Sequence, residues 1–270
     1  MSVVLASTWR PRGEMSRFQK LCPQLEQVYD SIVISLPPDT PAEDVGVLKA
    51  QPNILLAIND DWSWGRHSAI RRALETAASH VHYADLDRLL RWVETGPREW
   101  RQAVEAIQRA DCLIVGRTER AFRTHPQAMQ QTEQIVNRVF SHLLGKPVDP
   151  CAGSKGFSRR AAQFLMANSP PGHALGTDAE WPVLLQRAGF AVDCIAVDGL
   201  DWESADRYRL QAADQDTQGR AAEAYDEDAQ HWAFRVQVVL EIVESGLAAM
   251  QRPLGPPDCC PARAQGWDDE

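Results

Sequence analysis

The sequence lacks the features that mark membrane, nucleic-acid-binding and secreted proteins. No apolar run in its 270 residues approaches the roughly 20 residues that span a bilayer. Acidic residues outnumber basic ones by 37 to 28, so the basic stripe of a nucleic-acid-binding protein is not expected. The six cysteines show no paired metal-binding spacing, and the first six residues lack the charged flank of a signal peptide. These absences favour a cytoplasmic location.

The first 120 residues alternate short apolar runs with helical stretches. This alternation is typical of parallel strands joined by helical crossovers. The apolar runs predict five strands, at residues 3–6, 31–34, 53–58, 80–85 and 112–115. Apolar residues at helical spacing predict helices at 65–78 and 99–109. The pattern indicates an α/β fold.

The remaining residues are mostly helical in pattern. Helices are expected at residues 127–144, 159–167, 178–188 and 223–250, the last as one stretch or two, and a strand at 190–197. From residue 251 onward, prolines, small residues and an acidic end predict a disordered tail over 251–270. We therefore expect a single domain over residues 1–250.

Two carboxylates, Asp85 and Asp87, stand two residues apart just where the strand at 80–85 should end. Because side chains alternate along a strand, both are expected to project together at its carboxyl end, where open α/β sheets bind ligands. Such a pair suits a hard cation, Mg²⁺ or Mn²⁺, that in turn holds a diphosphate. The plain alternative is that Asp87 caps a helix over residues 88–93.

Five segments in this order resemble the GT-A glycosyltransferases, especially the inverting family that includes dolichyl-phosphate mannosyltransferase-like enzymes. They are GRHSAIRRAL at 65–74, YADLD at 83–87, VGR at 115–117, DPCAGSKGFSRR at 149–160, and TDAEW at 177–181 with AGF at 188–190. The resemblance covers roughly residues 3 to 203. It implies a GT-A-like, Rossmann-type nucleotide-binding domain with a mixed, mostly parallel sheet flanked by helices. Residues 1–120 would hold the nucleotide sugar and residues 121–250 the acceptor.

Two departures from the family pattern leave details open. The family's Asp-Ala-Asp-Leu begins here with Tyr83, so the carboxylate pair is shifted to Asp85 and Asp87. The family's base-reading Asp-Asp-x-Ser is replaced by SLPPD at residues 35–39, which leaves the nucleobase open.

The resemblance implies metal-dependent transfer of a sugar from a nucleotide-diphosphate sugar to a small-molecule or glycan acceptor. The cation held by Asp85 and Asp87 would neutralise the departing diphosphate. Asp178 is the candidate general base and Glu180 its alternate, because an attacking hydroxyl must lose its proton. A single-step inverting transfer is the simplest course, and a retaining one stays open. Capping of the helix at 178–188 by Thr177 or Asp178 is the structural alternative.

Four more side chains are candidates for donor contact. Thr8 and Arg10 lie in the loop after the first strand, Arg66 begins a helix, and Lys155 stands in a glycine-flanked turn. Some GT-A enzymes take a third metal ligand from a later histidine, and His173 in the loop before residue 178 is the candidate here.

Several tryptophans are candidates for stacking on the ligands. Trp9, after the first strand, is expected to stack on the nucleobase. Trp62, Trp64, Trp181 and Trp202 are expected to line an acceptor pocket, with core packing as the alternative for each.

Two other readings stay open. A sugar nucleotidyltransferase requires a glycine-rich basic loop after the first strand, and residues 7–13 hold arginines but one glycine. A non-catalytic relative that binds a sugar or nucleotide is the other alternative, which Tyr83 favours. The helical stretch at 223–250 offers a surface for a homodimer as easily as a cover for the sheet.

Overall fold

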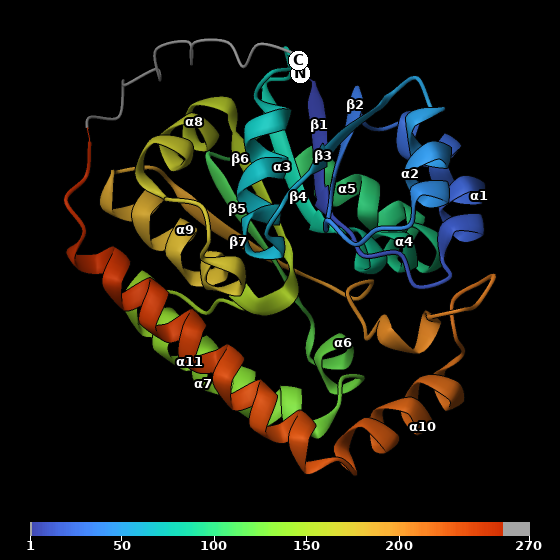
Figure 1. The fold of residues 1–270 in the computed structure, drawn as a ribbon. Coiled ribbons are helices and arrows are strands. Elements are labelled where there is room, and N and C mark those ends of the chain that lie inside the picture. The colour runs from blue at the N-terminus through green and yellow to red at the C-terminus, as the bar shows by residue number, and fades with distance from the viewer. Residues whose placement is uncertain (1, 256–270) are drawn as a thin grey trace.

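One seven-stranded sheet forms the centre of the computed structural model, which describes residues 2–255 (Figure 1). The strands are β1 (Val3–Thr8), β2 (Ser31–Leu36), β3 (Ile54–Ile58), β4 (His80–Asp85), β5 (Cys112–Arg117), β6 (Ser154–Ser158) and β7 (Val192–Val197). They are ordered β3-β2-β1-β4-β6-β5-β7. Strand β6 runs antiparallel to β4 and β5, and the other neighbouring pairs are parallel. The predicted mixed, mostly parallel sheet is confirmed.

Helices cover both faces of the sheet (Figure 1). One face carries α1 (Met15–Glu26), α2 (Ala42–Lys49), α4 (Leu86–Thr95) and α5 (Pro97–Ile107). The other carries α3 (Gly65–Ala73), α7 (Gln127–Leu144), α8 (Arg159–Asn168), α9 (Thr177–Arg187) and α11 (Ala229–Gln251). Alternating side chains of one strand feed both cores: in β1, Val4 packs on the α3 side and Leu5 on the α1 side.

Shorter elements complete the chain beyond the carboxyl ends of the strands. They are α6 (Glu119–Arg123), α10 (Gln215–Asp226) and the single turns η1 (Trp62–Trp64), η2 (Pro150–Ala152), η3 (Ala174–Gly176) and η4 (Ser204–Asp206). Figure 1 shows α6 and α10 below the sheet, next to the amino-terminal end of α11. These two helices cover the side of the molecule at which the parallel strands end.

Two predicted helices end elsewhere than the sequence suggests. The helix expected over residues 65–78 stops at Ala73, because the chain turns there to enter β4. The stretch expected over 223–250 is two helices, α10 and α11, and α10 begins already at Gln215. Asp228 starts α11 by accepting a hydrogen bond from the Gln230 N–H at 2.8 Å.

The carboxyl-terminal end of α11 stays attached to the body of the protein. Arg252 Nη1 donates to the Asn168 carbonyl at 3.1 Å, and the Gly255 N–H donates to Asn168 Oδ1 at 2.7 Å. Within residues 251–255, where the disordered tail was expected to begin, Arg252 and Gly255 thus make hydrogen bonds to Asn168. The rest of that expectation concerns residues 256–270, outside the described part of the chain. No helix within residues 2–255 has the length and hydropathy required to cross a bilayer.

Candidate functional site

A cavity of about 520 Å³ opens where β1, β2 and β4 end. Open α/β sheets bind ligands at this edge, and the volume is that of an ordinary small-molecule site. The near wall comes from the strand ends and includes Thr8, Ser35 and Asp85. The far wall comes from the β7–α10 loop and the following helices, with Trp202 and Phe234 among its residues. Residues from both halves of the chain thus line the cavity.

Asp85 is the last residue of β4 and is held from several sides. Tyr83 Oη donates to Asp85 Oδ1 at 2.6 Å, and Thr8 Oγ1 donates to the same oxygen at 3.3 Å. Arg66 Nη2 lies 3.4 Å from Oδ2. At Gly153 (φ +71°) an added Cβ would lie 2.4 Å from Asp85 Oδ2, so glycine is required at this close approach. Burial raises the pKa of Tyr83 far above its ordinary value, so the phenol remains a donor.

Asp87 lies in the first turn of α4, because the chain leaves β4 at Asp85 and the helix starts at Leu86. The prediction that both carboxylates project from one strand is therefore wrong. So is the capping alternative, since Asp87 follows the helix start and its Oδ1 accepts from the Arg88 N–H at 2.9 Å. Both Asp85 and Asp87 nevertheless line the same cavity.

A third carboxylate, Glu203 of the β7–α10 loop, lines the cavity beside them. Glu203 is 8% exposed, and its Oε2 has no hydrogen-bond partner among the described residues. Arg88 Nε lies 3.4 Å from this oxygen and 4.0 Å from Asp85 Oδ2. Burial, then the nearby charges of Glu203 and Asp85, raise the pKa of Asp87 to about 7. The three carboxylates are therefore close enough to raise the pKa of Asp87, although Arg66 and Arg88 lie beside them.

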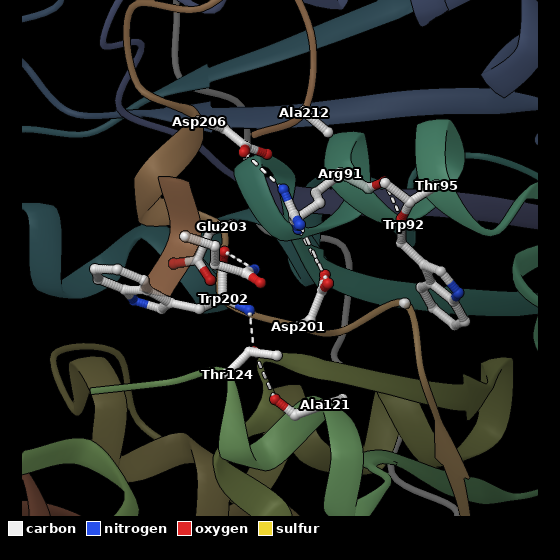
Figure 2. Close-up of polar contacts among 12 residues, drawn as sticks. Arg91, Trp92, Thr95, Ala121, Thr124, Asp201, Trp202, Glu203, Asp206 and Ala212 are labelled. Carbon is white, nitrogen blue, oxygen red and sulfur yellow. Dashed lines mark hydrogen bonds and ion pairs between the residues drawn. The ribbon is translucent and has the colours of Figure 1, made fainter. Parts of the chain in front are cut away.

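Buried ion pairs hold the loop that presents Glu203 (Figure 2). Arg91 of α4 donates to both carboxylate oxygens of Asp201, at 2.6 and 3.1 Å, and to Asp206 Oδ1 at 2.7 Å. The Trp202 N–H donates to Thr124 Oγ1 at 2.9 Å. Because these anchors flank Glu203 on both sides, its backbone is fixed to the helix that carries Asp87.

The cavity fits a hard divalent cation that a ligand helps to hold. Within residues 2–255, no three side chains of histidine, cysteine, aspartate or glutamate converge closely enough to enclose a metal by themselves. A diphosphate-bound Mg²⁺ needs only one or two protein carboxylates, since phosphate oxygens and water complete its shell. Asp85, Asp87 and Glu203 offer such oxygens, and Glu203 Oε2, which lies 3.4 Å from Arg88 Nε, makes no hydrogen bond among the described residues.

Asp178, the candidate general base, lies behind the cavity wall. It is 3% exposed, and its Oδ1 lies 2.7 Å from Arg66 Nη1 and 2.6 Å from Lys155 Nζ. Burial alone would raise the pKa of Asp178, but Arg66 and Lys155 outweigh it and hold the pKa below its ordinary value. Neither Asp178 nor Lys155 is among the residues that line the cavity. The helix N-cap is Gly176, so neither Thr177 nor Asp178 caps α9.

Glu180 and His173 pair with each other instead of joining the cavity carboxylates. His173 Nδ1 lies 2.8 Å from Glu180 Oε2, and Arg252 contacts the other oxygen of this fully buried carboxylate. Neither residue lines the cavity. The structure does not bring His173 together with Asp85 and Asp87.

The other predicted contact residues divide between cavity and core. Thr8 and Arg10 line the cavity, and Arg10 also pairs with Asp39 at 3.1 Å on the surface. Trp9 touches the cavity but is 4% exposed and packs against Phe18, which leaves no face for a nucleobase. Trp62 and Trp202 line the cavity as expected, whereas Trp181 is in the core.

Sequence reasoning missed Arg88, Glu203, Tyr225 and Phe234. A polar residue shortly after a strand was the signal that located Asp85, and Glu203 follows β7 in the same way. For Tyr225 and Phe234 no such signal exists, because they look like ordinary apolar positions of amphipathic helices.

No protein-family model matches the chain, and no curated protein matches its sequence. Its fold, however, resembles that of solved enzymes. The M. tuberculosis glucosyl-3-phosphoglycerate synthase superimposes with a TM-score of 0.55 and 11% identity, over 93% of this chain and 81% of that chain. Mannosyl-3-phosphoglycerate synthase from Rubrobacter xylanophilus gives a TM-score of 0.55 and 16% identity, over 98% and 80%.

A third similar structure is the M. tuberculosis enzyme in complex with Mn²⁺, UDP-glucose and phosphoglyceric acid. It has a TM-score of 0.51 and 11% identity, over 93% of this chain and 80% of that chain. These neighbours are GT-A glycosyltransferases, so the chain has the GT-A fold predicted from its sequence. At such low identities the likeness concerns the fold.

Proposed function

We propose that the protein is a metal-dependent glycosyltransferase that uses a nucleoside-diphosphate sugar as donor. The observation that carries this proposal is the cluster of three carboxylates, Asp85, Asp87 and Glu203, in a cavity at the carboxyl ends of β1, β2 and β4. The GT-A fold adds support, since a solved neighbour holds Mn²⁺ and UDP-glucose together. We propose that this protein binds the same two ligands and that Mg²⁺ can take the place of Mn²⁺.

In this proposal the side chains around Asp85 fix the cation-binding carboxylate. Bound Mg²⁺ or Mn²⁺ supplies the positive charge that stabilises a departing diphosphate. Tyr83 and Thr8 orient Asp85 by hydrogen bonds, and Arg66 balances part of its charge from behind. Asp178 keeps Arg66 in place, which makes it a positioning residue for the site.

The position of Asp178 bears on the stereochemical course. An inverting transfer, expected from the sequence, requires a free carboxylate base near the acceptor. Asp178 is occupied by Arg66 and Lys155, its pKa is lowered, and it does not line the cavity. We therefore favour retention: the acceptor oxygen bonds to the anomeric carbon as the diphosphate oxygen leaves and takes the acceptor's proton. The anomeric configuration of the product, read by NMR, decides between the two courses.

For the acceptor we propose a small molecule that carries an anionic group. Three arginines, Arg12, Arg207 and Arg235, line the cavity together with the apolar side chains of Met129 and Phe234. Guanidinium groups recognise carboxylates and phosphates, and apolar surfaces pack against carbon skeletons. Phosphoglyceric acid, which a solved neighbour binds, has this character. Phosphorylated and carboxylated hydroxy compounds are the acceptors to test.

The donor side is tested by thermal unfolding in the presence of UDP, GDP or ADP, each with Mn²⁺ or with EDTA. A ligand that binds the folded state raises the melting temperature, and the rise grows with the logarithm of ligand concentration above its Kd. We expect one nucleoside diphosphate to raise it only when Mn²⁺ is present. No response to any of them would favour a non-catalytic module, and a response to a nucleoside triphosphate with a sugar phosphate would favour nucleotidyl transfer.

We also propose a homodimer that forms through the outer face of α11 in a cytoplasmic protein. Val236, Leu240, Leu247 and Met250 are exposed on this helix at spacings of three, four and seven residues. Such a stripe is the seam that pairs helices in coiled coils. Light scattering on the eluting protein measures the mass directly, and a monomeric mass would remove this proposal.

A further inference from the structure

We infer that Arg12 and Arg207 form a clamp for a phosphate-like anion, and that Tyr208, docked on Gly13, is the positioning residue that assembles this clamp. The two arginines come from the β1–α1 loop and the β7–α10 loop, and both line the cavity. The inference rests on the proposed function, because it assumes that the cavity takes a ligand with a phosphate group.

The first observation is a junction between the two loops beside the cavity. The Tyr208 N–H donates to the Arg12 carbonyl at 3.1 Å. At Gly13, which has φ +84°, an added Cβ would lie 2.5 Å from Tyr208 Cδ1 and 3.0 Å from Tyr208 Cα, so this close approach requires glycine. Because Tyr208 follows Arg207 and Gly13 follows Arg12, the junction fixes the backbones of the two arginines relative to each other.

The second observation is the backbone conformation of Tyr208. This residue has φ +60°, in the left-handed region that residues other than glycine rarely adopt. Its side chain is 80% exposed, so burial of the ring does not repay the cost of this conformation. Strained residues of this kind are typical of sites where the strain serves a function. The hydrogen bond to Arg12 is made in this conformation, so we assign the strain to assembly of the clamp.

The third observation is that the segment carrying Arg207 is fixed at both ends and exposed between them. Residues 207–211 are exposed, whereas Asp206 and Ala213 are buried. Buried ion pairs hold Asp206, and the Ala213 N–H donates to Asp206 Oδ1 at 2.8 Å. The segment can therefore shift between its fixed ends without unfolding of the loop, and the junction with Gly13 sets its position.

The fourth observation is the charge of the two arginines. Arg207 Nη2 donates to Ser204 Oγ in a long hydrogen bond of 3.3 Å, and neither guanidinium forms an ion pair with a carboxylate of residues 2–255. The junction thus brings two positive charges to one cavity, and like charges repel. An anion that contacts both guanidinium groups replaces this repulsion with attraction. Anion binding and the junction therefore stabilise each other.

A purely structural role for the junction leads to different expectations. If Tyr208 and Gly13 only held the two loops together, Gly13→Ala would lower the melting temperature and leave the affinity for an anion unchanged. If they assemble the clamp, an anion tightens the junction, and Gly13→Ala weakens anion binding. The two roles are therefore separable without any activity measurement.

The first experiment follows hydrogen exchange of the Tyr208 amide in the full-length protein, because this N–H closes the junction. The probe is inorganic pyrophosphate, and NaCl of equal ionic strength is the control for screening. At about ten times its Kd, pyrophosphate should slow the exchange about tenfold, whereas NaCl should leave it unchanged. Exchange in Gly13→Ala should be about tenfold faster than in the native protein, the equivalent of one lost hydrogen bond. The matched control is Gly189→Ala, at φ +83° with open space around the added Cβ, which should leave the rate at its native value.

The second experiment is a calorimetric titration with pyrophosphate of the native protein, Gly13→Ala, Arg207→Gln and the double variant. Each single variant should bind about fivefold more weakly than the native protein, since each removes the benefit of a two-sided clamp. The double variant should bind about as weakly as Arg207→Gln alone, because Gly13 acts through the placement of Arg207.

An exchange rate of the Tyr208 amide that pyrophosphate leaves unchanged would overturn the inference, as would losses of affinity that add up in the double variant. The measurement on the native protein decides alone if Gly13→Ala does not fold. UDP, GDP, ADP and phosphoglyceric acid are then compared, and the compound that slows the exchange identifies the donor or the acceptor as the source of the anion.

The failure of this inference and that of the proposed function are distinguishable. A nucleoside diphosphate that binds with Mn²⁺, in a protein whose Tyr208 amide responds to no phosphate compound, would contradict the clamp and uphold the proposed function. Slower exchange with pyrophosphate, in a protein that binds no nucleoside diphosphate, would uphold the clamp and contradict the proposed function.

Discussion

Two sets of buried charges lie near Glu203, and they differ in how closely they are paired. In the anchor of the β7–α10 loop, Arg91 binds both oxygens of Asp201, and Asp206 is shared by Arg91 and Arg17. In the cavity, Asp85 pairs with Arg66 at 3.4 Å, Arg88 lies between Asp85 and Glu203 at 4.0 and 3.4 Å, and Glu203 Oε2 makes no hydrogen bond among the described residues.

This difference indicates which buried charges stabilise the fold and which form a binding site. A buried ion pair with all its hydrogen bonds made is costly to break, because the surviving charge is left without a partner. A group of under-paired carboxylates costs stability as it stands, and a bound cation relieves that cost. The anchor therefore behaves as structure and the cavity cluster as a site.

Breaking the anchor should have the largest effect on stability. Asp201→Ala leaves the buried Arg91 with Asp206 as its remaining carboxylate partner, so the free energy of unfolding should fall by about 3 kcal/mol. Urea unfolding followed by circular dichroism measures it. The matched control is Asp198→Ala, whose pair with Arg120 is about half exposed on both sides and should contribute less than about 1 kcal/mol. Equal losses in the two variants would contradict the contrast.

A buried histidine gives an intermediate case, hydrogen-bonded but without a counter-ion. His82 Nδ1 lies 2.7 Å from Tyr29 Oη and Nε2 lies 2.9 Å from Ser154 Oγ, and burial lowers the pKa of His82 to about 3. Below pH 6.5 the unfolded chain therefore takes up a proton that the folded protein refuses. Stability should fall as the pH drops from 6.5 toward 3, by up to about 1.4 kcal/mol per pH unit.

The His82→Gln variant measures this contribution directly. It removes the titrating group, so its free energy of unfolding should decline less steeply between pH 6.5 and pH 4.5 than that of the native protein. Urea unfolding at several pH values gives both slopes. Parallel slopes would mean that His82 takes up its proton in the folded state.

Relieving the cavity cluster should have a smaller effect and the opposite sign. Asp87→Asn removes one of three neighbouring negative charges, so the metal-free protein should gain about 1 kcal/mol of stability at pH 8. The same change should reduce the rise in melting temperature that Mn²⁺ produces. A clear loss of metal-free stability in Asp87→Asn would show that the cluster is structural after all.

The rim of the cavity should respond least. Arg10 and Asp39 form a pair that is 50% and 62% exposed, so Arg10→Ala should change the free energy of unfolding by less than about 0.5 kcal/mol. Its affinity for a nucleoside diphosphate should fall about threefold, as one surface phosphate contact is lost. Calorimetric titration compares it with Arg98→Ala, an exposed arginine on α5 that does not line the cavity.

The elements of the fold could be predicted because local signals specify them. Buried strands require continuous apolar runs, which located β1, β2 and β5. The helix expected over residues 127–144 matches α7, because Pro126 precedes it and Gly145 ends it in a left-handed conformation. The end of β4 in turn placed Asp85 at the cavity edge.

The roles within the site were harder to predict because they depend on partners distant in the sequence. An acidic residue at a helix start looks like a catalytic base until Lys155 and Arg66 are seen to hold Asp178 from two other elements. Glu203 looks like a loop residue until Arg91, more than a hundred residues earlier, is seen to fix its neighbours. Such pairings follow from the packed fold and leave no local pattern.

The most direct test of the central claim is a crystal structure of the protein soaked with Mn²⁺ and a nucleoside diphosphate, with the metal located by its anomalous signal. We expect one Mn²⁺ between the diphosphate and the carboxylates of Asp85, Asp87 and Glu203, with at least one carboxylate oxygen about 2.2 Å from the metal. A metal bound at His173 and Glu180, or a diphosphate bound in the cavity without any metal, would contradict it.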